Sequence, residues 1–330
     1  MKDLVYVTGH KNPDSDSICS AFSYSEFKKK TTNLPVIPVR LGNVSQETKF
    51  ILDYFGVEAP QLLETVKLKV EDLEIDNIEP VLPELSLKNA WNIMRDNHLK
   101  SLPVVGENKR LKGILSISNL TSSFMDILDN KILSKSNTSI ENILDTLEAK
   151  SLYINDSCKT FKGKIAVTAM QPESLKEIVD EGDVVLVGDR PEVQQALIDI
   201  KISLMIITGS HELASELLEK AKANGVTVIS TPYDSFTASR LLLQSIPVGY
   251  VMATDNLISF STDELVDDIK SVMAETRYHS YPVTDEDGKV IGTISRYHLI
   301  SNHKKKVILM DHNEKGQSVD GIEEAEVLEV

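Results

Sequence analysis

The sequence has few cysteines and lacks a long apolar run. Its two cysteines, Cys19 and Cys158, provide neither a disulfide framework nor a zinc-type spacing, which suits a reducing compartment. The longest apolar runs, such as LMII, fall far short of the roughly 18 residues that a membrane helix needs, and no signal segment precedes them. These features predict a cytoplasmic protein that does not bind a membrane.

Positive charge is also scarce. The chain has 50 acidic against 35 basic residues and a formal charge of −15. Such a charge repels phosphate backbones unless basic residues cluster locally, and no long basic cluster is present. Nucleic acid is therefore not an expected partner. With 330 residues, of which 41% are hydrophobic, the chain is long enough for two or three ordinary domains.

Two segments of the chain match without gaps at a spacing of 179 residues, the separation of Pro103 and Pro282. Each copy predicts an amphipathic helix, a strand, a polar turn, a strand and a second helix. A pair of such units would pack its apolar strands on its helices and leave a cleft between the two copies. The identities are Met94, Ser101, Pro103, Val104, Gly113, Ser116, Leu120 and Ser122, repeated as Met273, Ser280, Pro282, Val283, Gly292, Ser295, Leu299 and Ser301.

The region between the copies, residues 131–245, alternates β-branched runs with helical periodicity. Runs such as DVVLVGDR and LMIITGS are each followed by a helical pattern, which predicts an α/β domain with a mostly parallel sheet. Gly225 follows a lysine-rich helix and is expected to be its C-terminal cap. Asp189 is expected to cap the helix after VGDR, although Gly188, Asp189 and Arg190 can alternatively bind an anion there.

Two end pieces, residues 1–68 and 304–330, flank this arrangement. The first predicts strand, loop, helix, strand and helix, and the second begins with the strand KKKVILMD. Neither piece predicts a complete domain by itself. We therefore expect one α/β domain that a long insertion interrupts, with its two parts meeting in space.

Histidine and aspartate gather where the first strand ends. His10 closes the strand LVYVTGH, and Asp14 and Asp16 lie in the loop that leads into the next helix. Ligands bind at the carboxyl ends of parallel strands, so these three side chains are expected at one rim. An aspartate just before a helix is more often an N-cap than a metal ligand, and this motif alone leaves both interpretations open.

The strand VILMDHNE places Asp311 at the equivalent rim position. One imidazole with several carboxylates favours Mn²⁺, Co²⁺ or Mg²⁺. A carboxylate shared by two such ions holds them about 3.5–4 Å apart, an arrangement that activates water and clamps phosphoryl oxygens. Hydrolysis of a phosphate ester or phosphoanhydride is therefore expected, although DHNE by itself can equally be a polar junction between strand and turn.

The motifs GHKNPDSDSICSA and MDHNEKGQSVDGIEEAEVLE resemble those of family II, manganese-dependent inorganic pyrophosphatases of the DHH superfamily. The insertion resembles the regulated subfamily, in which two CBS domains flank a DRTGG domain; VGDRPEVQ and IITGS resemble the DRTGG pattern, with Ser210 where a second glycine is usual. The implied fold is α/β, a DHH-type parallel-sheet domain with this insertion. The implied segments are the first part of the DHH domain (1–68), CBS domain 1 (69–128), the DRTGG-like domain (129–245), CBS domain 2 (246–303) and the second part of the DHH domain (304–330).

The resemblance implies hydrolysis of inorganic diphosphate by two Mn²⁺ or Co²⁺ ions, with Mg²⁺ accompanying the substrate. It makes His10 and Asp14 ligands of one ion, Asp16 a ligand of the other, and Asp311 the bridging carboxylate. Enzymes of this family continue into a DHH motif with further ligands and a C-terminal domain that binds diphosphate. The chain is therefore expected to be an N-terminal part that is inactive alone. A homodimer is also expected, with the DRTGG-like domain as a spacer and dimer contact.

CBS pairs resemble adenine-nucleotide sensors. AMP or ADP is expected to inhibit, and ATP or a diadenosine polyphosphate to activate. The aspartate that usually binds ribose is replaced by Asn119 and by His298, which puts conventional ribose contacts in doubt. Lys100, Arg277 and Tyr278 can alternatively be exposed turn residues that bind no ligand. The expected nucleotide-binding residues are Lys100, Ser116, Asn119, Arg277, Tyr278 and Ser295.

Two other functions remain open. The first is a non-catalytic module that senses adenine nucleotides, but the intact His10, Asp14, Asp16 and Asp311 argue against decay of a metal site. The second is a DHH-type phosphodiesterase acting on oligonucleotides or cyclic dinucleotides. The acidic composition and the segment DHNEKGQ make this second alternative the weaker one.

Overall fold

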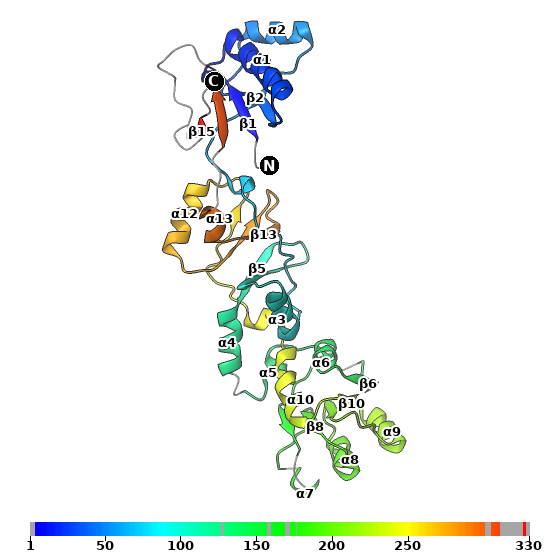
Figure 1. Ribbon diagram of the computed structural model, residues 1–330. Coiled ribbons are helices and arrows are strands. Elements are labelled where there is room, and N and C mark those ends of the chain that lie inside the picture. Colours follow the sequence, from blue (N-terminus) through cyan, green and yellow to red (C-terminus); the bar gives the residue numbers. More distant parts are fainter. Residues whose placement is uncertain are drawn as a thin grey trace. The chain divides into compact units, whose positions relative to one another are not determined.

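The computed structural model describes residues 4–126, 129–156, 160–168, 172–175, 177–300, 305–310 and 326–327. The chain divides into two units, whose elements are labelled in Figure 1. Unit 1 comprises Met1–Asn77, Ser259–Gly288 and Gly292–Val330, and unit 2 comprises Ile78–Ile258 and Lys289–Ile291.

Unit 1 contains a parallel sheet built from both end pieces of the chain. Its strand order is β15-β14-β1-β2-β3. Val5 lies opposite Lys306 and Thr8 opposite Leu309, so the predicted meeting of the two end pieces is confirmed. The strands are β1 (Val5–Thr8), β2 (Val36–Arg40), β3 (Gln61–Leu62), β14 (Lys306–Leu309) and β15 (Glu326–Val327).

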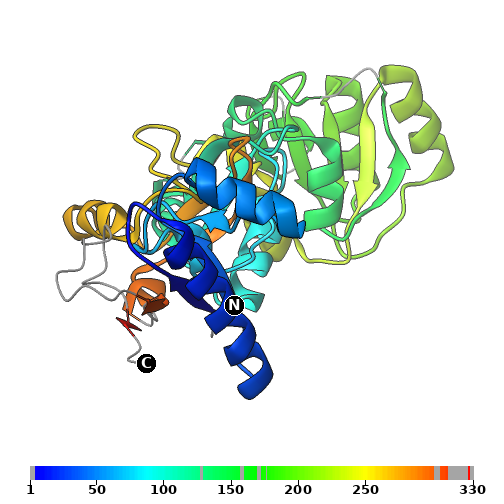
Figure 2. The ribbon, with the colours of Figure 1, turned by 90° about the horizontal axis from the view of Figure 1, so that it is seen from above.

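Alternate residues of these strands face opposite sides of the sheet, as the two-residue period of a strand requires. Val5 and Val7 pack with Ala21 of helix α1 (Ser15–Thr31). Tyr6 instead packs near Val66 and Val307 on the other side. Helix α2 (Gln46–Phe55) contacts α1, and both helices can be followed in blue in Figure 2.

The two repeat copies fold alike, the first in unit 2 and the second, apart from Lys289–Ile291, in unit 1. Val81 pairs in parallel with Val104 just as Phe260 pairs with Val283, which confirms the register of the repeat. Met94 and Met273 are both buried. The first copy has α3 (Leu87–Asp96), β4 (Ser101–Val105), β5 (Leu111–Ser116) and α4 (Ile117–Asp126); the second has β11 (Phe260–Ser261), α12 (Val266–Glu275), β12 (Tyr281–Thr284), β13 (Val290–Ile294) and α13 (Arg296–Ile300).

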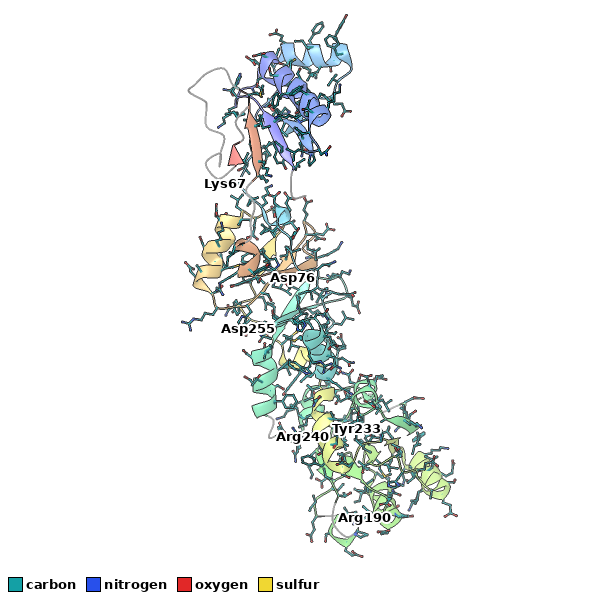
Figure 3. The ribbon with its side chains drawn as sticks, viewed as in Figure 1. Lys67, Asp76, Arg190, Tyr233, Arg240 and Asp255 are labelled. Atoms are coloured by element: carbon teal, nitrogen blue, oxygen red, sulfur yellow. The ribbon has the colours of Figure 1, made fainter. Side chains whose placement is uncertain are left out.

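Each copy is completed by the segment that leads into the other copy. Residues 69–76, which include the 3₁₀ turn η1 (Val70–Asp72), pair with the second copy through the bridge from Asp76, labelled in Figure 3, to Thr293. The segment that includes α11 (Val248–Val251) pairs with the first copy through the bridge from Ile114 to Ala253.

These crossings explain the glycines that the repeat shares. A Cβ atom on Gly113 would lie 2.8 Å from the carbonyl oxygen of Ala253, and one on Gly292 would lie 2.5 Å from that of Asp76. A side chain at either position would push the crossing backbone away. The glycines therefore permit close approach of two backbones.

The middle part of unit 2 is an α/β domain, drawn in green to yellow in Figure 2. Its sheet has the order β6-β10-β9-β8-β7 and is parallel except for β6, as the sequence predicts. The strands are β6 (Lys150–Tyr153), β7 (Ile165–Val167), β8 (Val184–Val187), β9 (Leu204–Ile207) and β10 (Thr227–Ser230).

Helices cover both faces of this sheet, which is why every residue of β8, β9 and β10 is buried. Val185 and Val187 pack on α8 (Pro191–Ile200), α9 (Ser215–Asn224) and α7 (Pro172–Leu175). Val184 and Leu186 face the core that includes α6 (Ile140–Thr146) and α10 (Ser235–Leu242). The short elements α5 (Ile132–Lys135) and η2 (Leu243–Ser245) border that core.

Of the two helix caps predicted in this domain, one is confirmed and one is wrong. Gly225 ends α9 in the left-handed conformation, with φ at 70°. Asp189 does not cap α8, because this helix begins one residue later, with Arg190 at the N-cap and Pro191 in the first turn. Ser210 has a φ of 60°, the left-handed backbone that favours a glycine at this position.

Within the described part of the chain, no helix has the length and apolar character that crossing a membrane requires.

We expect Gly292→Ala to destabilise the protein by about 1–3 kcal/mol, because the added methyl group must displace the backbone of Asp76. Urea unfolding measures this change. Gly188→Ala is the control, because a Cβ there would meet nothing within 4 Å. Equal stabilities of the two variants would contradict the packing argument.

Candidate functional site

The predicted metal-binding residues of the first motif lie where β1 ends beside β14. The backbone N–H of Met310 donates to the carbonyl oxygen of Thr8 over 2.7 Å, which extends the pairing of the two strands to this edge. His10 follows directly, and its Nε2 atom lies 3.4 Å from Oδ1 of Asp14. The structure therefore brings these two predicted ligands together.

Asp14 is the N-cap of α1, as the cap interpretation of the motif predicts. Its Oδ1 accepts a hydrogen bond of 2.8 Å from the backbone N–H of Ser17, and its side chain is 58% exposed. A carboxylate offers about four lone-pair sites, so one capping bond does not exclude a metal ion. Asp16 lies in the first turn of α1, where its carboxylate accepts a hydrogen bond from the Ser20 hydroxyl.

Close packing fixes the loop that carries these side chains. A Cβ atom on Gly9 would lie 1.8 Å from Oγ of Ser17, so the backbone before His10 presses directly on the first turn of α1. The Ser17 hydroxyl is buried and has no hydrogen-bond partner in the described part of the chain. A Cβ on Gly42 would likewise lie 2.4 Å from the carbonyl oxygen of Lys11. The loop therefore has little room to shift, which suits a site of fixed geometry.

Asp311, the predicted bridging ligand, lies outside the described residues. Among the residues that are described, no three His, Cys, Asp or Glu side chains form a group that could hold a metal ion. The pair of His10 and Asp14 is a mixed nitrogen and oxygen donor set, which fits Mn²⁺ or Co²⁺. The complete ligand set stays a prediction.

The predicted ribose-binding positions form matching helix caps in the two copies. The Ser116 N–H donates to Oδ1 of Asn119 over 2.9 Å, and the Asn119 N–H donates back to the Ser116 hydroxyl. In the second copy the Ser295 N–H donates to Nδ1 of His298 over 3.0 Å. The first pair is a capping box; the second contains only one of its two bonds, since the His298 N–H donates to the carbonyl oxygen of Ser295. Asn119 and His298, which stand where the aspartate is usual, thus help to fix the start of the second helix in each copy. Asn119 also lines a cavity of about 400 Å³ together with Tyr250.

The loop before β12 carries Arg277 and Tyr278, both exposed. The Tyr278 ring lies edge-on to the buried ring of Tyr281, with centroids 5.9 Å apart. The Arg296 guanidinium donates hydrogen bonds to the carbonyl oxygens of Met273, Thr276 and Tyr278 and so holds this loop in place.

Sequence reasoning missed Arg296. The first copy has Ile117 at the equivalent position, so the repeat gave no signal for an arginine there. Exposed Lys100, with Ser116 and Asn119, lies in unit 2, whereas Ser295 belongs to unit 1 with the loop before β12. That these residues line one cleft stays a prediction.

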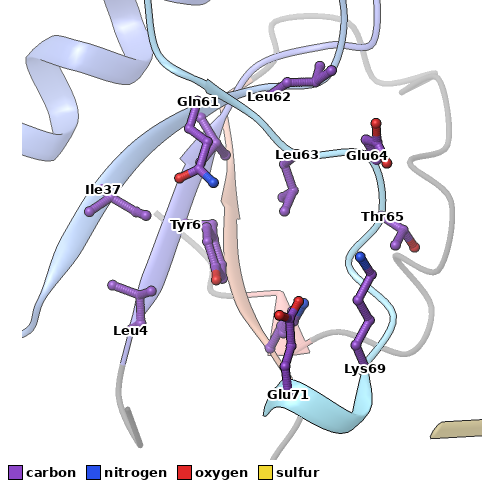
Figure 4. A pocket seen from close by; sticks show the side chains of 12 residues that line it. Leu4, Tyr6, Ile37, Gln61, Leu62, Leu63, Glu64, Thr65, Lys69 and Glu71 are labelled. Atoms are coloured by element: carbon purple, nitrogen blue, oxygen red, sulfur yellow. The ribbon is translucent and has the colours of Figure 1, made fainter. Parts of the chain in front are cut away.

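A cavity of about 600 Å³ lies on the face of the unit 1 sheet opposite α1. Figure 4 shows Leu4, Tyr6 and Ile37 on the sheet side of this cavity, with Leu63, Glu64 and Thr65 across from them. Burial, followed by the charges of Asp72 and Glu71, raises the pKa of Tyr6. The lining residues between 63 and 71 show that the cavity adjoins the segment in which the chain leaves the sheet after β3.

Known families match the repeat and the middle domain. The CBS domain model matches residues 70–126 and 248–304, and the DRTGG domain model matches residues 142–245. This chain contains two CBS domains around a DRTGG domain. The predicted insertion is thereby confirmed.

Relatives extend the similarity to the end pieces. The chain is 64% identical over 330 residues to a cobalt-dependent inorganic pyrophosphatase of Clostridium perfringens, covering all of this chain and 60% of the relative. It is 33% identical over 329 residues to a probable manganese-dependent inorganic pyrophosphatase of Thermotoga maritima, covering 99% of this chain and 60% of that relative. The chain thus spans about 60% of the length of these relatives. The predicted resemblance to inorganic pyrophosphatases with CBS and DRTGG domains is confirmed.

A solved structure matches the insertion. It is the CBS and DRTGG regulatory region of the Clostridium perfringens pyrophosphatase, in complex with the activator diadenosine tetraphosphate. It matches with a TM-score of 0.68 and 59% identity, covering 70% of this chain and 100% of that chain.

Because the pKa of Tyr6 is raised, the stability that its neutral form provides should be present below the unfolded value of about 10 and lost as the pH rises through the folded value. Unfolding free energies at pH 8.5 and above pH 10 measure this loss. Tyr6→Phe keeps the ring but cannot ionise, and it should lose less stability over the same range. Identical pH profiles would contradict the effect.

Proposed function

We propose that this chain belongs to a metal-dependent inorganic diphosphatase that adenine nucleotides regulate through its CBS domains. The observation that carries the proposal is the parallel pairing of β1 with β14, the two strands that precede the end motifs, with His10 beside Asp14 where β1 ends. The similarity to pyrophosphatases over the whole chain supports the same function.

In this proposal His10, Asp14, Asp16 and Asp311 hold two Mn²⁺ or Co²⁺ ions. When bound, the ions activate water and polarise the phosphoryl oxygens of diphosphate, which is accompanied by Mg²⁺. The chain's own residues set the position of these ligands. Asp14 is held by its capping bond to Ser17, and the packing of Gly9 on α1 fixes the approach of His10.

Regulation is proposed to occur at the CBS domains. The Clostridium perfringens regulatory region is in complex with diadenosine tetraphosphate as an activator, and its 59% identity supports the same ligand class here. AMP and ADP as inhibitors and ATP as a further activator follow from the family resemblance alone. The phosphates would meet Lys100 and Arg277, and the adenine would stack on Tyr278. Ser116, Asn119 and Ser295 would bind the nucleotide together with the backbone groups that their hydrogen bonds hold in place.

We further propose that the protein is a cytoplasmic homodimer that binds neither nucleic acid nor a membrane. The net charge of −15 supports the exclusion of nucleic acid.

Arg277→Ala should weaken binding of diadenosine tetraphosphate and AMP by at least about tenfold, because a charge-assisted hydrogen bond is worth about 1.5–3 kcal/mol. Titration calorimetry with the full chain measures both affinities. Lys49→Ala, which removes an exposed charge from α2, should leave them unchanged. The absence of nucleotide binding by the unaltered chain would overturn the regulatory part of the proposal.

Asp14→Ser separates the cap from the metal site, because serine caps a helix as well as aspartate but lacks a carboxylate. We expect nearly unchanged stability and Mn²⁺ affinity lower by at least about tenfold. Asp234→Ser is the matched control, since Asp234 caps α10 through the same kind of bond, which its Oδ1 accepts from the backbone N–H of Thr237. Equal Mn²⁺ affinity of both variants would show that Asp14 is a cap alone.

A further inference from the structure

The chain crosses between the unit 1 sheet and the second CBS domain twice. The first crossing follows β3 and the second precedes β14. The first crossing forms backbone hydrogen bonds with that domain. The Val70 N–H donates to the carbonyl oxygen of Glu264 over 3.0 Å, and the Glu71 N–H donates to that of Thr262 over 2.9 Å. Val70 is buried. The segment that follows β3 is therefore held by the backbone of the second copy.

An ion pair ties the second crossing to the first. Nζ of Lys305, the residue before β14, lies 2.9 Å from Oδ2 of Asp72. The same carboxylate oxygen accepts a hydrogen bond of 2.9 Å from the backbone N–H of Lys69. The side chains of Lys305 and Asp72 are only 12% and 24% exposed, so solvent and salt screen this pair less than a surface pair. We call Lys69, Asp72 and Lys305 the connector clamp.

Apolar contacts continue the clamp toward the sheet. Val66 of the first crossing and Val307 of β14 are buried together beside Tyr6. Lys69 and Glu71 lie at the lower end of the cavity in Figure 4, near the start of β14. Both crossings consequently meet the sheet at one place, and β14 leads from there to the predicted ligand Asp311.

We propose that Asp72 and Lys305 are positioning residues that couple nucleotide binding at the CBS domains to the geometry of the metal site. This inference rests on the proposed function. The loop with Arg277 and Tyr278 belongs to the same copy that holds the first crossing. A shift of that copy pulls on Asp72, and the ion pair transfers the shift to Lys305 and hence to β14. Without the ion pair, the two crossings respond separately.

Coupling of this kind is a reciprocal change in two affinities. Nucleotide should change the Mn²⁺ affinity of the full chain, by about 5–150-fold if the coupling is typical. We define the coupling ratio as the Mn²⁺ affinity with nucleotide divided by the affinity without it. In Asp72→Asn and in Lys305→Met this ratio should fall to within about twofold of one. The affinity for nucleotide alone should stay nearly unchanged, because neither residue is among the predicted nucleotide contacts.

The experiment is a titration of Mn²⁺ into the full chain with and without saturating diadenosine tetraphosphate. The charge exchange Asp72→Lys with Lys305→Asp should restore part of the ratio that either single variant loses. Lys220→Met, which breaks the exposed pair of Lys220 with Asp199 in the DRTGG domain, is the control and should keep the full ratio.

The outcomes separate the coupling from the function. A ratio in Lys305→Met equal to that of the unaltered chain overturns the role of the clamp, as does a ratio of one in the unaltered chain. If the unaltered chain binds no nucleotide or no Mn²⁺, the proposed function itself fails. Loss of the ratio in both single variants, with both individual affinities retained, supports the clamp.

Discussion

Parallel pairing of β1 with β14 is the constraint on which the rest of the structure depends, because the two strands come from opposite ends of the chain. Closing the long segment between them costs little extra entropy, about 0.6 kcal/mol for each doubling of its length. The register is firm because a slip of one residue would turn Val5 and Val7 away from α1. The carboxyl ends of both strands therefore stay at one edge, where His10 and Asp14 lie.

The insertion satisfies a second constraint, since each CBS copy borrows the segment that enters the other. This exchange places backbone against backbone at Gly113 and Gly292. It also pairs residues 69–76, which belong to the first crossing, with the second copy. The sheet and that copy thus share two crossings of the chain, held by Lys305 and Asp72. In the proposed function, a domain inserted in this way acts on the sheet through its attachment points.

Several side chains have a local role and a proposed functional one. Asp14 caps α1 while it lies beside His10, and the Asn119 side chain accepts the Ser116 N–H and so fixes the start of α4. Sequence reasoning anticipated that Asp14 can cap α1 and lie beside His10, because the motif itself contains both the helix start and the histidine. It failed for Asp189, since Pro191 sets the start of α8 one residue later than the pattern of side chains indicates.

The sequence by itself determined the repeat and its register, the parallel middle domain, the interrupted sheet and the resemblance to a family. These properties depend on periodicity and on motifs, which are local and can be read along the chain. Only the tertiary structure decided that Arg296 holds the loop of Tyr278, that each copy borrows a segment, and that Asp72 meets Lys305. Such contacts join residues far apart in sequence, and no local pattern fixes which of many charged side chains will meet once the backbone has folded.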